Sequence, residues 1–250
     1  MRRALISDIH GNLEAFQAVM ADLKTQSIDE IYCLGDIVGY GPNPVECLDL
    51  VMKHSKLTIV GNHDQATIID PIGFNAIALR AIRWTRTELE RGPSRSANNR
   101  WDYITDLPKQ HQEEKFLFVH GSPADATNEY VFPEHQYDKT KMDRWFSKVP
   151  QYCFQGHTHI AGVFTPDPEF IEASECDYSF SLGREKLMIN VGSVGQPRDD
   201  DPRACYTILD LNAKKIFFRR VEYDIEKTIE KIYAIPELDN QLGDRLRGGR

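Results

Sequence analysis

The first half of the chain alternates short apolar runs with segments in which apolar residues recur at helical spacing. Residues 12–24, 43–54 and 74–89 each follow a strand-like run, and each predicts a helix. In the second of these helices Asn43 is placed to cap the first turn, and Glu46 completes a capping-box pattern. Alternation of this kind predicts an α/β sheet with helices packed on its faces.

The second half of the chain is richer in strands. Helices are predicted at residues 138–148 and 225–234, and most of the remaining pattern is typical of strands. The clearest strand-like runs of this half are 151–156, 162–166, 186–192, 204–211 and 215–223. The whole pattern predicts two packed sheets with helices outside. We expect one domain of residues 1–235 and a polar C-terminal tail at 236–250.

The composition and charge of the chain disfavour two classes of protein, general nucleic-acid binders and membrane proteins. The 250 residues carry 30 Lys and Arg against 38 Asp and Glu, and the net charge of −8 disfavours a general nucleic-acid binder. No apolar run approaches the roughly 20 residues of a transmembrane helix, and the N-terminal run is too short for a signal-peptide core. We therefore expect no membrane association and a cytoplasmic location. The five cysteines are dispersed, which predicts reduced thiols and no thiolate zinc site. The oligomeric state is left open.

Five strand-like runs end in residues that commonly bind metal ions. The motifs are Asp8-x-His10, Gly35-Asp36, Gly61-Asn62-His63-Asp64, His120-Gly121 and Gly156-His157-Thr158-His159. The carboxyl ends of strands in α/β sheets gather functional groups, and neighbouring glycines permit tight turns and close backbone approach. One such motif alone is more often a turn or a cap. Five at successive strand ends predict a metal site at one edge.

The number of candidate ligands suits two ions better than one. Three side chains offer oxygen and four offer nitrogen: Asp8, Asp36, Asn62, His10, His120, His157 and His159. A single ion with an open coordination position would not use seven side chains, whereas two ions that share a bridging carboxylate would. Mixed oxygen and nitrogen ligation without thiolate favours Mn, Fe or Zn.

The order and spacing of these blocks resemble the calcineurin-like metallophosphoesterase superfamily, whose pattern is D-x-H, G-D, G-N-H-D/E, H and G-H-x-H. The runs GDIVGYGPNP and NVGSVGQPR resemble its small bacterial and archaeal, phosphodiesterase-like branch. The resemblance implies an α/β (α+β) fold: a four-layer αββα sandwich of two mixed sheets flanked by helices, with a dinuclear site at one edge. It also implies two divalent ions, with Mn as the first choice and Fe, Zn or Ni as alternatives.

The resemblance implies a role for each residue of the five blocks. The first ion would be bound by Asp8, His10 and His159, the second by Asn62, His120 and His157, with Asp36 bridging both. His63 would be the general acid that protonates the leaving oxygen while a metal-bridging hydroxide attacks phosphorus. The expected substrate is a small phosphodiester or phosphomonoester, with nucleotides among the candidates.

The second block departs from the protein Ser/Thr phosphatases of the superfamily. Those proteins carry G-D-x-V-D-R-G, and this chain has Gly39 and Tyr40 in place of the aspartate and the arginine. A phosphoprotein substrate is therefore disfavoured, and the group that orients His63 is left open. Asp64 either steadies His63 as a catalytic partner or caps the following turn.

Residues 80–100 carry six arginines against two glutamates, in contrast to the acidic chain as a whole. Arg83 and Arg86 either lie on a solvated helix face or overhang the site and attract anionic substrates.

The loop after the strand-like run 186–192 holds two further arginines. Arg198 or Arg203 either binds a phosphate or pairs with the neighbouring aspartates. Tyr40 is another candidate substrate contact.

Three other functions compete with a small-molecule phosphoesterase. A nuclease is disfavoured because the chain is acidic and shows no basic groove. A non-catalytic metal-binding scaffold subunit and a protein Ser/Thr phosphatase are the alternatives. Turnover of a phosphoester by the metal-loaded protein would distinguish an enzyme from a scaffold.

Overall fold

The computed structural model describes all 250 residues and contains two six-stranded sheets. The strand order of the first sheet is β3 (Leu57–Thr58), β2 (Glu30–Cys33), β1 (Arg2–Ile6), β11 (Ala204–Asp210), β12 (Lys215–Val221) and β9 (Ser179–Ser181). Strands β1, β2 and β3 run parallel to one another, and the remaining pairs are antiparallel.

The second sheet is also mixed. Its strand order is β4 (Gln110–Glu113), β5 (Phe116–Val119), β6 (Tyr152–Gln155), β10 (Leu187–Asn190), β7 (Gly162–Thr165) and β8 (Glu169–Glu172). Strands β5, β6 and β10 are parallel, and the others pair antiparallel. Each sheet therefore contains three neighbouring parallel strands, and within a sheet the carboxyl ends of these three strands lie at the same edge.

The core of the molecule lies between the two sheets. Leu5 of β1 and Leu209 of β11 face Phe118 of β5 and Phe154 of β6 in one buried cluster. The rings of Phe118 and Phe154 stack with their centroids 5.6 Å apart. Large aromatic and branched side chains from both sheets thus fill one continuous layer, and their burial provides the main driving force for packing the sheets together.

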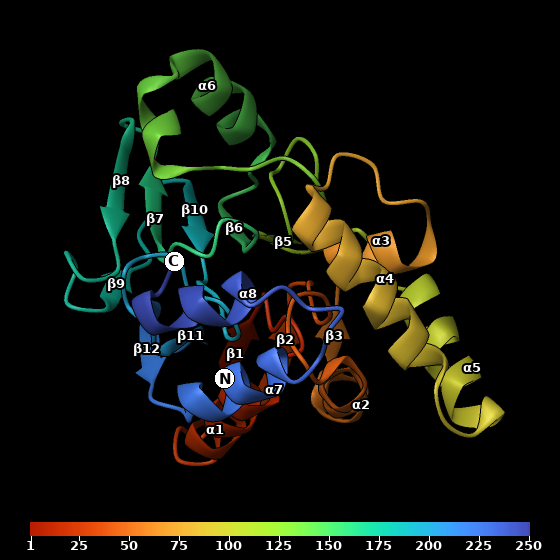
Figure 1. Cartoon of the computed structure of the whole chain (residues 1–250). Helices are drawn as coiled ribbons and strands as arrows, with labels where there is room; N and C mark the ends of the chain where they lie inside the picture. The colour runs from red at the N-terminus through yellow and green to blue at the C-terminus, as the bar shows by residue number, and fades with distance from the viewer.

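Helices cover the outer face of each sheet (Figure 1). Helices α1 (Leu13–Leu23) and α2 (Pro44–His54) bury their apolar sides on the first sheet. On the other side, α6 (Lys139–Lys148) packs on the second sheet through Trp145, which is fully buried. The layer order is helix, sheet, sheet, helix. The expected four-layer αββα sandwich is therefore confirmed.

The remaining helices lie around these layers. They are α3 (Asn62–Ile68), α4 (Ala76–Glu90), α5 (Ser94–Thr105), α7 (Ile225–Tyr233), α8 (Gln241–Asp244) and the 3-10 helices Pro133–Tyr137 and Arg245–Gly248. Of these, α4 and α7 fall where the sequence predicts helices. The predicted capping box at Asn43 is wrong, because the Asn43 side chain makes no cap hydrogen bond. Its amide oxygen instead accepts a hydrogen bond from Lys231 of α7 at 2.8 Å.

Residues 236–250, expected as a polar tail, pack against the rest of the chain. Leu238, Leu242 and Leu246 are buried, and they form one apolar cluster with Trp84 of α4 and Ile229 of α7. In Figure 1 these C-terminal elements, drawn in blue, lie next to α7 and in front of the first sheet. The segment is thus attached through three leucines at helical spacing.

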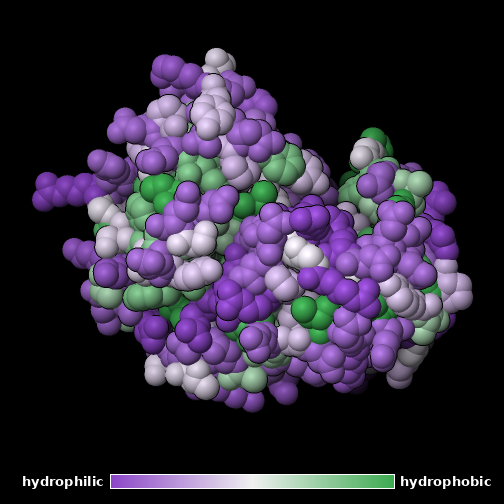
Figure 2. All heavy atoms as spheres, turned by 60° about the vertical axis from the view of Figure 1, so that its left-hand side comes forward, coloured by the Kyte–Doolittle hydropathy of each residue, from purple (hydrophilic) through white to green (hydrophobic).

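The surface carries few large apolar side chains. Figure 2 shows a face on which hydrophilic residues predominate. Ile72, in the loop before α4, is the most exposed large hydrophobic side chain at 90%. All five cysteines are free, and no helix is long and apolar enough to cross a membrane.

Candidate metal centre

The carboxyl ends of five strands bring the seven candidate ligands to one edge of the sandwich. Strands β1, β2 and β3 of the first sheet lead into the segments of Asp8, Asp36 and Asn62, and strands β5 and β6 of the second lead into those of His120 and His157. All seven candidate side chains are buried. Residues up to about 150 positions apart in the chain therefore meet where the two sheets adjoin.

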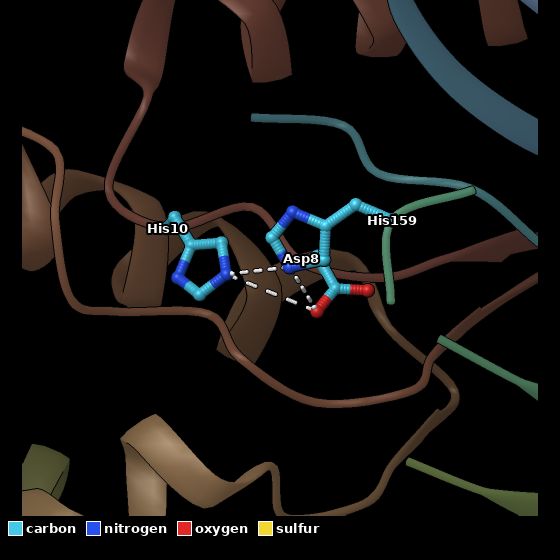
Figure 3. Close-up of side chains that lie close together, drawn as sticks. All are labelled: Asp8, His10 and His159. Atoms are coloured by element: carbon cyan, nitrogen blue, oxygen red, sulfur yellow. Dashed lines mark hydrogen bonds and ion pairs between the residues drawn. The ribbon is translucent and has the colours of Figure 1, made fainter. Parts of the chain in front are cut away.

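Asp8, His10 and His159 form the first cluster (Figure 3). The Nε2 atoms of His10 and His159 lie 3.2 Å apart, and His159 Nε2 lies 3.1 Å from Asp8 Oδ1. His10 Nε2 is 3.8 Å from the same carboxylate oxygen. Two residues of this cluster follow a strand of the first sheet and one follows a strand of the second, so the cluster joins the sheets.

The second cluster contains Asp36, His120 and His157, with Asn62 beside them. His120 Nε2 lies 3.2 Å from Asp36 Oδ2, 3.1 Å from Asn62 Oδ1 and 3.1 Å from His157 Nδ1. Asp36 Oδ2 is also 3.7 Å from His10 Nε2 in the first cluster. The Asp36 carboxylate therefore lies between the two clusters.

Backbone carbonyls fix the orientation of all four imidazoles. The contacts are His10 Nδ1 to Val38 O (3.2 Å), His120 Nδ1 to Leu34 O (2.8 Å), His159 Nδ1 to Gln196 O (2.6 Å) and His157 Nε2 to Asn128 O (3.2 Å). A ring nitrogen that faces a carbonyl carries the proton, so the other nitrogen of each ring points into the cluster. The residue after Asn128, Glu129, accepts a hydrogen bond from the Trp145 indole at 2.8 Å.

The first cluster fits a cation. Burial lowers the pKa of both His10 and His159, so both rings are neutral and turn unprotonated Nε2 atoms toward each other. Asp8 Oδ1 is buried without a hydrogen-bond donor. Its pKa is lowered, against the effect of burial, by the nearby histidines. Two facing lone pairs and an unpaired carboxylate oxygen would be costly without positive charge among them.

The second cluster also attracts positive charge. Burial opposes protonation of His120, but the Asp36 carboxylate raises its pKa to about 9. Burial and the neighbouring His120 lower the pKa of His157 to about 3, so that ring is neutral. The second cluster thus brings together one carboxylate, one amide oxygen and two imidazoles, which belong to Asp36, Asn62, His120 and His157. This donor set suits a hard or borderline divalent ion.

Backbone strain is concentrated at these ligands. Five of the candidates have left-handed φ angles: Asp8 (54°), His10 (49°), Asp36 (52°), His157 (69°) and His159 (64°). Such conformations cost of order 1–3 kcal/mol each for residues other than glycine, and they cluster at functional sites. Strain at five ligand positions indicates that the fold holds these side chains in a required geometry.

His63 lies beside both clusters and is held by ring packing. Its ring centroid is 4.4 Å from that of Tyr40, 4.9 Å from His10 and 5.0 Å from Phe74. Nδ1 is buried without a partner, and no hydrogen bond occupies the other ring nitrogen. Burial lowers the pKa of His63 to about 4.

Gly39 leaves the space that the His63 ring occupies. A Cβ atom at Gly39 would lie 2.5 Å from His63 Nδ1, and the φ angle of this glycine is +92°. The aspartate that protein Ser/Thr phosphatases carry at this position would therefore collide with His63 here. Aromatic neighbours and a glycine surround the His63 ring, and the Asp36 carboxylate accepts a hydrogen bond from the His63 backbone N–H at 2.8 Å.

Asp64 accepts hydrogen bonds from three backbone N–H groups. They belong to Ile37 (2.9 Å), Val38 (3.2 Å) and Gly61 (3.1 Å). No hydrogen bond joins Asp64 to the His63 ring, and burial and Asp36 raise the pKa of Asp64 to about 7. The contacts of Asp64 tie the loop that follows β2 to the first turn of α3.

The candidate substrate-binding arginines have different surroundings. Arg203 pairs with Asp201 at 2.6 Å, whereas Arg198 pairs with no carboxylate and lies over the Tyr40 ring, 6.0 Å from its centroid. Arg83 is exposed on α4 in a surface hollow. Neither Arg83 nor Arg86 contacts the ligand clusters. The structure thus brings Arg198 and Tyr40 to the site, and it does not bring the two helix arginines there.

Arg245 is a residue near the site that the sequence pattern missed. It lies with Tyr40 in the lining of one pocket, in the C-terminal segment. The charged residues of segment 236–250 predict a polar tail, and for that reason Arg245 is not among the candidate site residues. The signal that could have found it is the four-residue spacing of Leu238, Leu242 and Leu246, which is typical of a packed helical face.

The family model described as the calcineurin-like phosphoesterase superfamily domain matches residues 1–214. The chain belongs to this superfamily, as the order of its motifs indicates. Membership, together with the buried His/Asp clusters, indicates a phosphoesterase that binds divalent metal.

Two relatives match along the whole chain. A metallophosphoesterase from Sphaerobacter thermophilus is 32% identical with a TM-score of 0.82, over 100% of this chain and 99% of that one. An uncharacterized protein from Methanocaldococcus jannaschii is 38% identical over 99% of this chain and 98% of its own length. A symmetrical bis(5′-nucleosyl)-tetraphosphatase from Haemophilus ducreyi is 27% identical over 48% of this chain and 45% of its own length.

Proposed function

We propose that this protein hydrolyses a small phosphoester with two divalent ions, and that His63 protonates the leaving group. The observation that carries the proposal is the pair of neutral imidazoles, His10 and His159, whose Nε2 atoms face each other at 3.2 Å beside the unpaired oxygen of Asp8. Asp36 lies between this cluster and the second one, which supports two ions that share a carboxylate.

The chain's own residues would supply binding, orientation and a proton. Asp8, His10 and His159 would hold one ion, and Asn62, His120 and His157 the other. When bound, the ions would activate water and neutralise phosphoryl charge. Mn is our first choice, because the donor set mixes oxygen and nitrogen without thiolate.

His63 is placed to act on a substrate held beside the clusters. Its Nδ1 packs toward Gly39, where nothing accepts a proton, so Nε2 is the nitrogen we assign to proton donation. Burial lowers the pKa of this ring to about 4, so the proposal requires that the negative charge of a bound phosphoester raise that pKa enough to protonate the ring. Asp64 would act through the backbone by positioning the turn that carries Asn62 and His63. The steric contact at Gly39 further disfavours a site of the protein-phosphatase type.

The substrate is a small phosphodiester or phosphomonoester. Several curated relatives are named symmetrical bis(5′-nucleosyl)-tetraphosphatases, although the match to each spans less than half of its length. This similarity supports including a dinucleoside tetraphosphate among the substrates tested.

The test is metal-dependent turnover in matched variants. The protein would be stripped with a chelator, reloaded separately with Mn²⁺, Fe²⁺, Zn²⁺ or Mg²⁺, and assayed on an aryl phosphodiester, an aryl phosphomonoester and the tetraphosphate. We expect metal-dependent hydrolysis that falls about 10²–10⁴-fold in His63→Ala at unchanged metal content. His111→Ala, at a histidine of strand β4, is the control. Two bound ions with no turnover of any substrate would instead favour the scaffold function.

A further inference from the structure

Two arginines from distant parts of the chain lie near Tyr40. Arg198, in the loop after β10, is 6.0 Å from the Tyr40 ring centroid. Arg245, at the end of α8, lines a pocket of about 340 Å³ together with Tyr40. Tyr40 also contacts the site, because its ring lies 4.4 Å from His63 and 4.8 Å from His10. The two guanidinium groups are therefore one aromatic ring away from the candidate metal centre.

Neither guanidinium pairs with an aspartate or a glutamate. Arg198 donates to the amide oxygen of Gln196 at 2.7 Å, and Arg245 donates to the terminal carboxylate oxygen of Arg250. Asp244, the carboxylate in the pocket lining, hydrogen-bonds Tyr233 and lies 3.6 Å from Arg247.

Other arginines in these two segments and in β12 pair with acidic side chains, so the lack of an aspartate or glutamate partner distinguishes Arg198 and Arg245. Arg203, Arg220, Arg247 and Arg250 all have aspartate or glutamate partners. Burial and the nearby charge of Arg198 lower the pKa of Arg245 to about 10. Two close positive charges repel each other, and a bound anion would lower that cost.

We propose that Arg198 and Arg245 together bind a second phosphate group of the substrate, next to the phosphoryl group at the metal centre. The C-terminal segment 236–250 then completes the active site, although it lies beyond the residues 1–214 that the family model matches. The guanidinium fork suits phosphate oxygens, and two forks match a doubly charged group. The substrate class would be esters that also contain a phosphoanhydride, such as nucleoside diphosphates or longer polyphosphates.

This inference rests on the proposed function for the placement of the first phosphate, so its test measures nucleotide binding, separately from the turnover assay described above. Adenosine 5′-diphosphate and adenosine 5′-monophosphate differ by one phosphate. Their affinities for the full-length, Mn²⁺-loaded protein would be measured by calorimetry in wild type, Arg245→Gln, Arg245→Lys and Arg198→Gln. Arg247→Gln is the matched control, because Arg247 belongs to the same 3-10 helix and pairs with Glu226.

We expect Arg245→Gln and Arg198→Gln each to weaken diphosphate binding about 10–100-fold, the range for charged hydrogen bonds, and to leave monophosphate binding unchanged. Arg245→Lys should restore part of the affinity, which also covers the case in which the glutamine variant unfolds. Equal losses for both nucleotides, or no loss, would overturn the inference. Selective loss in a protein that hydrolyses no phosphoester would support the second-phosphate site and refute the hydrolase function.

Discussion

Adding one methyl group at Gly39 should displace His63. The Cβ of Gly39→Ala would lie 2.5 Å from His63 Nδ1, whereas non-bonded heavy atoms prefer about 3.5 Å, so the ring must move by about 1 Å. A misplacement of ~1 Å in a reacting group can cost about 10²-fold in rate. The alanine must also adopt a φ of +92°, at a cost of about 1–2 kcal/mol in folding free energy.

Gly73→Ala separates these two effects. Gly73 has a φ of +85°, and a Cβ there meets no atom within 4 Å. Both variants should therefore lose a similar ~1–2 kcal/mol in urea unfolding. Only Gly39→Ala should lose about 100-fold in kcat on the aryl phosphodiester, with metal content by mass spectrometry unchanged. Equal kcat values in the two variants would show that Gly39 does not set the position of His63.

Three further variants test other parts of the structure. Asp36→Ala should reduce bound metal from about two ions toward none, while His159→Ala should leave about one, counted by mass spectrometry; equal stoichiometry in both would argue against a bridging Asp36. Leu246→Ala should lower the free energy of unfolding by about 2–5 kcal/mol, against under ~0.5 kcal/mol for the exposed Ile72→Ala, and similar values would mean that the C-terminal segment is not packed. Hydrogen bonds from Ser122, Trp145 and Arg144 lower the pKa of Glu129 below its usual 4.5 against the effect of burial, so its charge stabilises the fold above that pH. The stability lost in Glu129→Gln should therefore be present at neutral pH and shrink as the pH falls through the folded-state pKa, and a pH-independent loss in urea titrations would refute the assignment.

The layer architecture and the convergence of the ligands could be predicted because both depend on local pattern. Helical spacing in residues 12–24 and 43–54 and polar residues directly after strands are visible in single segments. The parallel order of β1, β2 and β3 then brings Asp8, Asp36 and Asn62 to one edge.

Features that depend on tertiary partners could not be predicted. Helix α5 was missed because it buries Arg100, which pairs with Asp49 of α2 at 2.7 Å, where the periodicity would require an apolar residue. The capping box at Asn43 failed because Lys231, distant in sequence, binds the amide. The separation of Arg198 from Arg203 likewise follows from three-dimensional contacts, since both lie in the same loop near several aspartates.

Each ligand cluster takes side chains from both sheets, so a bound ion would act as a cross-link through the middle of the chain. His10 and His159 are 149 positions apart, and an ion that binds both of them only in the folded state stabilises that state by its binding free energy. Amide exchange in the strands of both sheets should slow together when metal is supplied. The resistance of this protein to proteolysis in a cell would then vary with the free metal concentration, even in a variant that has lost all activity.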